Sequence, residues 1–99
     1  MRTRIQIPQS EIEAFCRRHR IRRLALFGSV LRDDFGPDSD IDVLVEFEPG
    51  AKVGLRFFAF EQELSDLLGR KVDLSTPMFL SKYFREQVLA EMETLYAAP

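Results

Sequence analysis

Two aspartates stand two positions apart at the start of an apolar stretch. Asp40 and Asp42 flank Ile41, and residues 43–45 are Val, Leu and Val. This composition predicts a β-strand, in which residues two apart point to the same face of the sheet. Two carboxylates side by side on one face repel each other, and a divalent cation between them removes the repulsion. Mg²⁺ takes one or two carboxylates and completes its shell with water and phosphate oxygens, so the pair predicts a magnesium site.

A third carboxylate lies in a second short apolar run. Asp73 stands between Val72 and Leu74, and a strand formed by this run can bring it beside the acidic pair. Three carboxylates can hold two ions, and two ions stabilise both the attacking and the leaving oxygen of a displacement at phosphorus. We therefore expect Asp40, Asp42 and Asp73 to be catalytic residues and ligands of two Mg²⁺ ions. Asp73 is expected at the second ion, where it helps to deprotonate the incoming hydroxyl.

A glycine and a serine follow directly after the apolar run at residues 24–27. Gly28 lets the backbone approach a phosphate closely, and the short helix expected at residues 30–32 offers free N–H groups to an anion. The hydroxyl of Ser29 is expected to donate a hydrogen bond to a β- or γ-phosphate. This segment therefore predicts the nucleotide-binding part of the site.

The connection between the two motifs has the composition of a loop, because residues 33–39 contain Gly, Pro, Ser and several Asp residues. Arg32, just before this loop, is expected to bind phosphate or to anchor the acidic loop. Ser39, the last residue of this loop, is the fourth nucleotide-binding candidate, beside Gly28, Ser29 and Arg32.

Each of these pieces has an ordinary structural interpretation when it is taken alone. A Gly-Ser pair is usually a turn, an Asp-x-Asp sequence is often an exposed strand edge, and Asp73 alone would pass for a strand-end residue. The conjunction favours function, since the Gly-Ser pair follows a strand and the carboxylates lie on the next two strands.

The same residues carry a resemblance to a known family. The segment from Phe27 to Val45, with Asp73 downstream, resembles the polymerase-beta-like nucleotidyltransferases, and specifically their minimal members, the MNT proteins. Residues 61–74 resemble the helix, glycine stop and third acidic strand of those proteins, so the likeness spans nearly the whole chain. The resemblance implies an antitoxin that binds a HEPN ribonuclease toxin as a hetero-oligomer. It also implies Mg²⁺-dependent transfer of AMP from ATP to a tyrosine hydroxyl of that toxin.

Three alternatives stay open. An antitoxin that acts by binding and occlusion alone would not need all three carboxylates. A transferase for small molecules needs walls around its substrate, which usually come from an added domain. A transferase for RNA needs a basic surface, and the candidates are Arg17, Arg18, Arg20, Arg22 and Arg23. The net charge is −2 and cations are stabilised near a helix C-terminus, so we expect a solvated or partner-facing patch and no direct nucleic-acid binding.

Length and composition indicate one minimal nucleotidyltransferase domain, residues 1–99, with an ordinary globular balance of 45% hydrophobic and 30% charged residues. No apolar run approaches the roughly 20 residues that span a bilayer, and the first eight residues lack the apolar core of a signal peptide. The single cysteine, Cys16, excludes an internal disulfide and fits a helical core position. We therefore expect a cytoplasmic location and no membrane contact.

The hydrophobic spacing predicts a first helix from about Pro8, a second from about Val53 to Leu68 with Gly69 as its stop, and a last helix from Pro77 through Leu95. Three strands alternate with these helices. The expected fold is a two-layer α/β palm, with a small mixed sheet of about three strands, helices packed on one face and the active face open. The many phenylalanines between Leu55 and Phe60 exceed what one buried helix face needs, which indicates a partner surface.

Overall fold

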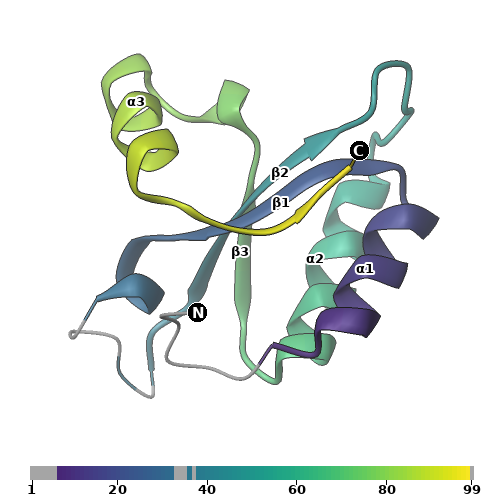
Figure 1. The fold of residues 1–99 in the computed structure, drawn as a ribbon, viewed down its shortest axis with the longest axis horizontal. Helices are drawn as coiled ribbons and strands as arrows, with labels where there is room; N and C mark the ends of the chain where they lie inside the picture. Colours follow the sequence, from purple (N-terminus) through teal and green to yellow (C-terminus); the bar gives the residue numbers. More distant parts are fainter. Residues whose placement is uncertain (1–6, 33–35, 37, 99) are drawn as a thin grey trace.

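The computed structural model describes residues 7–32, 36 and 38–98. Its elements in chain order are α1 (Gln9–Arg18), β1 (Ile21–Phe27), the 3-10 turn η1 (Gly28–Leu31), β2 (Ile41–Phe47), α2 (Arg56–Leu68), β3 (Val72–Ser75), the 3-10 turn η2 (Pro77–Phe79), α3 (Lys82–Glu91) and β4 (Glu93–Ala97) (Figure 1). Within the described residues, every helix is too short or too polar to cross a membrane.

The four strands form one mixed sheet in the order β3-β2-β1-β4. β1 is antiparallel to both β2 and β4, whereas β2 is parallel to β3. This arrangement confirms the small mixed sheet and the α/β class that the sequence predicts. The strand β4 is not among the three predicted strands.

The last helix is shorter than the sequence pattern predicts. Pro77 starts only the turn η2, and α3 begins at Lys82 and ends at Glu91. Leu95 keeps helical spacing with Val88, yet it lies in β4, where it is buried. The outer edge of β1 explains this difference, because its backbone N–H and C=O groups need partners and β4 supplies them. Pairing between distant segments therefore overrides the local helical spacing.

One face of the sheet packs on α1 and α2. Because side chains alternate along a strand, every second residue of β1, β2 and β3 points into this layer. The buried cluster includes Leu24, Leu26, Ile41, Val43, Val72 and Leu74 from the strands, and Ile12, Phe15, Cys16, Phe60 and Leu64 from the helices. Burial raises the pKa of the Cys16 thiol to about 12, as expected for a cysteine that packs in the core and does not react.

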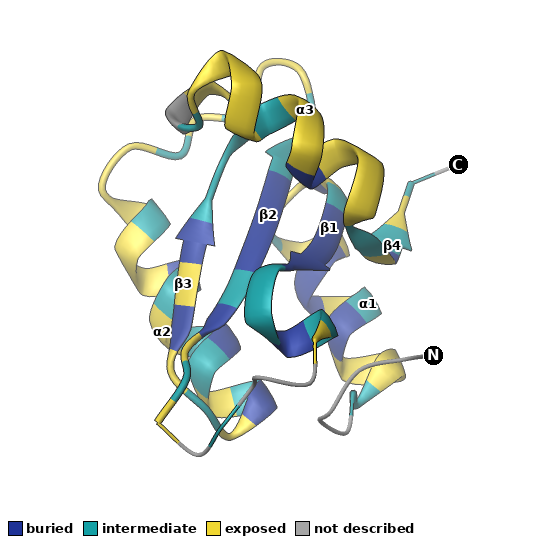
Figure 2. Cartoon of the chain, turned by 90° about the vertical axis from the view of Figure 1, so that its left-hand side faces the viewer, coloured by how far each residue is buried: buried dark blue, intermediate teal, exposed yellow. Residues whose placement is uncertain are grey.

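The opposite face of the sheet carries α3. Val88 packs there with Phe27 of β1 and Leu44 of β2, while most of the helix surface stays exposed (Figure 2). The prediction of helices on one face only is therefore wrong for α3. The reason is that Phe27 and Leu44 place apolar surface on this face, and α3 covers it through Val88.

The helix α2 ends as predicted and starts later than predicted. Gly69 takes a left-handed conformation with φ of 70° and stops the helix after Leu68. At the other end, Gly54 has φ of 52°, which is incompatible with a right-handed helix, so α2 begins only at Arg56.

Replacing Leu64 by alanine should lower the free energy of unfolding by about 2–5 kcal/mol, because Leu64 is 0% exposed and its removal leaves a cavity between α2 and the sheet. Leu55→Ala is the matched control: Leu55 is 84% exposed and its replacement should change stability by less than about 0.5 kcal/mol. Urea unfolding of both variants checks this. Similar losses of unfolding free energy for the two variants would contradict the placement of Leu64 on the face of α2 that packs against the sheet.

Candidate active site

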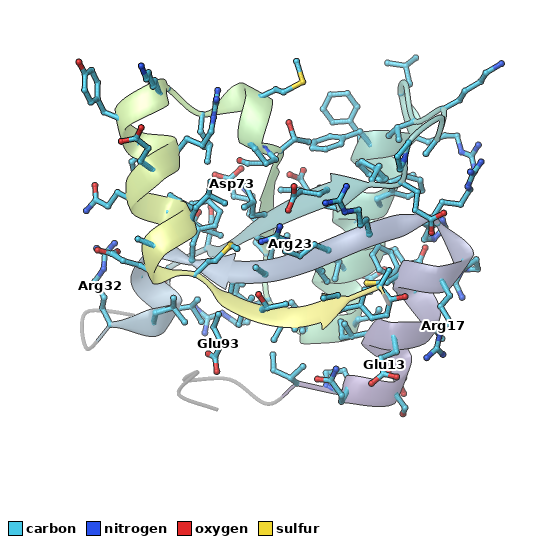
Figure 3. The ribbon with its side chains drawn as sticks, turned by 45° about the horizontal axis from the view of Figure 1, so that its top comes forward. Glu13, Arg17, Arg23, Arg32, Asp73 and Glu93 are labelled. Atoms are coloured by element: carbon cyan, nitrogen blue, oxygen red, sulfur yellow. The ribbon has the colours of Figure 1, made fainter. Side chains whose placement is uncertain are left out.

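Asp42 and Asp73 lie directly opposite each other on adjacent parallel strands. The register pairs Asp42 of β2 with Asp73 of β3. Their neighbours Ile41, Val43 and Val72 point into the core on the other face. Alternation therefore places both carboxylates on the face that carries α3, and Figure 3 shows Asp73 on that side. The structure thus brings together the two aspartates that the sequence places on separate strands.

Asp40 lies at the edge of this pair. It precedes the first residue of β2, and its Oδ2 is 4.0 Å from Nζ of Lys71, with both side chains exposed. Among the residues that the structure describes, no three His, Cys, Asp or Glu side chains are arranged closely enough to hold a metal ion. A three-carboxylate cluster therefore requires the exposed Asp40 side chain to rotate away from Lys71.

Of the three aspartates, Asp42 is the one whose charged form is clearly disfavoured by its surroundings. Burial raises the pKa of Asp42, and the negative charges of Asp73 and then Asp40 raise it further, while Arg32 opposes them. Burial disfavours the charged form and like charges disfavour it again. Carboxylate oxygens are the donors that Mg²⁺ prefers, and a cation beside this pair would relieve both costs. The donor chemistry therefore fits a divalent metal held by Asp42 and Asp73, with Asp40 completing the set.

Gly28 stands against the Asp42 carboxylate. Its φ is 76°, in the left-handed region, and a Cβ built on it would lie 2.3 Å from Oδ2 of Asp42. The contact follows from the sheet, because Phe27 is the register partner of Asp42. A glycine is therefore required here by both its backbone conformation and the space that Asp42 occupies.

A pocket of about 330 Å³ opens between η1 and α3. Its lining residues are Phe27, Gly28, Ser29, Arg32, Asp42, Phe84, Gln87, Val88 and Glu91. It thus collects three of the four nucleotide-binding candidates, Gly28, Ser29 and Arg32, next to Asp42. The four residues from α3 were not among the candidates. Their spacing of three, four and seven residues from Phe84 marks one helix face, but in the sequence this pattern indicates only burial.

Ser39 lies outside this pocket. Its Oγ accepts a hydrogen bond of 3.1 Å from the Gly36 N–H, and its carbonyl oxygen accepts one of 2.7 Å from Arg70. Arg70 also donates to the carbonyl oxygen of Gly36 at 2.7 Å. Ser39 therefore closes the turn before β2 in this structure. Positions 33–35 and 37 of the predicted loop lie outside the described residues.

Two side chains of α2 hold the strand that carries Asp73. The Val72 N–H donates to Oγ of Ser65 at 3.0 Å, and the Leu74 N–H donates to Oε2 of Glu61 at 2.9 Å. These N–H groups point away from β2 and flank Asp73. The helix therefore fixes the position of Asp73 along the sheet, a role for Ser65 and Glu61 that the sequence pattern alone does not indicate.

The geometry agrees with comparisons to known proteins. A model of the family described as "Nucleotidyltransferase domain" matches residues 10–95. The protein adenylyltransferase MntA of Thermococcus cleftensis is 38% identical over 72 residues, which are 73% of this chain and 72% of that protein. A candidate protein adenylyltransferase of Methanocaldococcus jannaschii is 44% identical over 73 residues, covering 66% of this chain and 74% of the relative.

Solved structures share the fold. One is described as a candidate minimal nucleotidyltransferase, with a TM-score of 0.72, 38% identity and 86% coverage of each chain. A toxin-antitoxin complex with AMP-PNP gives a TM-score of 0.73 at 22% identity, with coverage of 93% of this chain and 75% of the other. A complex of a tri-AMPylated Shewanella oneidensis HEPN toxin with an MNT antitoxin gives 0.65 at 23% identity, with 91% and 70% coverage.

Asp42→Asn should raise the melting temperature of the metal-free protein by a few degrees at pH 7. The folded-state pKa of Asp42 is raised, so the wild type loses stability as the pH rises through that value, and the uncharged Asn does not. The difference should vanish below about pH 4, where the aspartate is protonated in both the folded and the unfolded state. Thermal melts in EDTA across this range test it. Equal melting temperatures of the wild type and Asp42→Asn at pH 7 would contradict a raised pKa of Asp42 in the folded state.

Gly28→Ala should destabilise the protein by more than the about 1–2 kcal/mol expected for a left-handed alanine. The excess comes from the overlap of its Cβ with Asp42. Gly69→Ala is the matched control, since Gly69 has φ of 70° and no atom within 4 Å of the added Cβ. Denaturant unfolding of the two variants separates the clash from the backbone strain. Equal losses would show that Asp42 moves aside at no cost.

Proposed function

Because this chain belongs to the nucleotidyltransferase domain family, we propose that it is an antitoxin that transfers AMP from ATP to a tyrosine hydroxyl of a cognate HEPN ribonuclease toxin. The observation that carries the proposal is the pairing of Asp42 with Asp73 beside a pocket lined by Gly28, Ser29 and Arg32. A repelling carboxylate pair next to donors for anions is the arrangement that phosphoryl-type transfer needs.

The pocket residues suit a triphosphate. The Ser29 hydroxyl can donate to a phosphate oxygen, and the Arg32 guanidinium supplies a charge-assisted partner. Mg²⁺, when bound by the aspartates, neutralises them together with the phosphates and lowers the pKa of the attacking hydroxyl. We assign Asp42 and Asp40 to the side of the triphosphate, and Asp73 to the side of the acceptor.

The proposed reaction is an in-line displacement. The acceptor oxygen forms a bond to the α-phosphorus of ATP while the bond from that phosphorus to the bridging oxygen breaks, so pyrophosphate leaves with the electron pair. The Asp73 carboxylate accepts the proton of the acceptor hydroxyl. Asp73 suits this role because it is exposed, whereas the partner Asp42 is half-buried beneath the pocket.

The surroundings of the site favour a protein as the acceptor. The helix α3 forms one wall of the pocket, and large apolar side chains on α3 and on the preceding turn η2 are exposed. They are Met78 (86% exposed), Tyr83 (85%) and Phe84 (47%). Phe84 also lines the pocket itself. Aromatic residues and methionine are enriched in protein interfaces. At the start of α2, Leu55 and Phe58 are exposed as well, but α2 packs on the other face of the sheet and these two residues do not border this pocket.

The comparisons support the same proposal. The Thermococcus cleftensis relative is named a protein adenylyltransferase, and the Shewanella oneidensis complex pairs an MNT antitoxin with an AMPylated HEPN toxin. The complex with AMP-PNP supports ATP as the nucleotide.

Co-expression with the product of the adjacent gene, expected to be the cognate HEPN toxin, should give a stable complex in which that partner gains one or more AMP groups with ATP and Mg²⁺. Asp42→Asn and Asp73→Asn should each lower transfer by about 100-fold or more, since each removes a charge that the reaction requires. Asp66→Asn, the same change at an exposed position of α2, should leave transfer unchanged. Intact-mass spectrometry of the partner measures the AMP groups.

The other outcomes separate the alternatives. An unmodified partner that is nonetheless neutralised would establish inhibition by occlusion and overturn catalysis. Label from α-labelled ATP on RNA or on a small molecule would overturn the toxin as acceptor and keep nucleotidyl transfer.

A further inference from the structure

A second pocket, of about 280 Å³, lies at the other end of the sheet. It forms where the α1–β1 connection meets the β2–α2 connection, and Figure 1 shows both connections at the same end of the molecule. Its lining side chains include Arg18, His19, Arg20, Lys52, Arg56 and Phe60. The seven residues of β1 separate it from Gly28, a distance of roughly 20 Å. It is therefore distinct from the carboxylate site.

The pocket concentrates positive charge in a chain whose net charge is −2. Glu63 pairs with Arg18 and with Nε2 of His19, and Glu48 approaches Arg20 at 3.8 Å. Neither glutamate lines the pocket. Four arginine and lysine side chains thus line the pocket, only two carboxylates pair with them, and the pocket keeps an excess of cationic donors.

The other two cations of the pocket, Lys52 and Arg56, are not paired with carboxylates in the described structure. Arg56 lies over the Phe60 ring at 5.9 Å from the ring centre, a cation–π contact that orients the guanidinium. Within the part of the chain that the structure describes, Lys52 and Arg56 form no ion pair. Their N–H groups are therefore free to bind an anion.

The backbone of Arg20 is strained. Its φ is 57°, and it is the one residue other than glycine with positive φ among those described. It stands just after the end of α1, where glycine or asparagine normally takes this conformation. A side chain in this region costs stability, and such strain at a residue that lines a pocket points to function. Glycine would be the more stable residue at this position.

We propose that this second pocket binds a phosphate group. Two or more guanidinium groups and an ammonium group around one cavity are the donors that recognise phosphate oxygens. The volume of the pocket accommodates a phosphate or pyrophosphate group. The phosphate belongs either to a free phosphorylated small molecule or to a phosphodiester chain that crosses the pocket.

The probe is sodium pyrophosphate, added to the full chain in EDTA. Without metal, the charged carboxylates disfavour an anion at the first pocket, and the amide shifts report which of the two pockets binds. Amide chemical shifts should move at Gly50 and Ala51, which line the pocket, and saturate with pyrophosphate. Sodium chloride at equal ionic strength should not reproduce these shifts. Equal shifts with chloride, or shifts centred on Gly28 and Ser29, would overturn the proposal.

The variants test the charge and the strain separately. Arg20→Gln and Arg56→Gln should each weaken pyrophosphate binding by about tenfold or more. Arg20→Gly should weaken it equally and raise the melting temperature by about 4 °C or more, because it also removes the strain. Arg17→Gln is the matched control: Arg17 is exposed, pairs with Glu13 and lies outside the pocket, so binding should be unchanged. If Arg17→Gln weakened pyrophosphate binding equally, the effect would come from the net charge of the protein, and the proposed phosphate site would be overturned.

Two further ligands identify the source of the phosphate. AMP that binds as tightly as pyrophosphate assigns the pocket to a free phosphorylated small molecule. A single-stranded oligonucleotide that binds at least about tenfold tighter than AMP assigns it to a phosphodiester chain, with a marked loss of affinity as salt rises. Failure of pyrophosphate, AMP and the oligonucleotide to bind would overturn the proposal.

Discussion

Repulsion between the carboxylates of Asp42 and Asp73 constrains the face of the sheet that carries α3. The parallel register of β2 and β3 places them opposite each other, and neither can turn into the core, where Ile41 and Val72 already lie. The fold holds the two residues side by side through the backbone pairing of β2 and β3. Two like charges held side by side in this way cost stability, and the donor chemistry of the pair fits a cation that would relieve that cost.

The helix α3 packs beside Asp42 and also forms part of the pocket next to it. The helix covers Phe27 and Leu44, the neighbours of Asp42 in the sheet, and burial is the largest cause of the raised pKa of the Asp42 carboxyl group. The same helix supplies one wall of the pocket through Phe84 and Glu91. One packing contact, centred on Val88, therefore both covers this part of the sheet and shapes the pocket beside Asp42.

The parts that the sequence predicts are those with a local physical cause. Strand alternation and turn residues suffice to place Asp42 and Asp73 on strands and Gly28 on a turn, and all three lie as predicted. The parts that it misses depend on distant partners. Leu95 belongs to β4 because β1 needs an edge partner, and Ser39 bonds to the Gly36 turn and to Arg70 from another element. No local pattern encodes either contact.

The side chains of α2 that bond to β3 have an effect beyond the site. β3 is an edge strand, and the outward N–H groups of an edge strand ordinarily offer a template for a further strand from another molecule. In this chain the N–H groups of Val72 and Leu74 are already occupied by Ser65 and Glu61. A foreign strand would have to displace both bonds before it could pair. The hydrogen bonds that position Asp73 therefore also protect this edge against β-sheet aggregation.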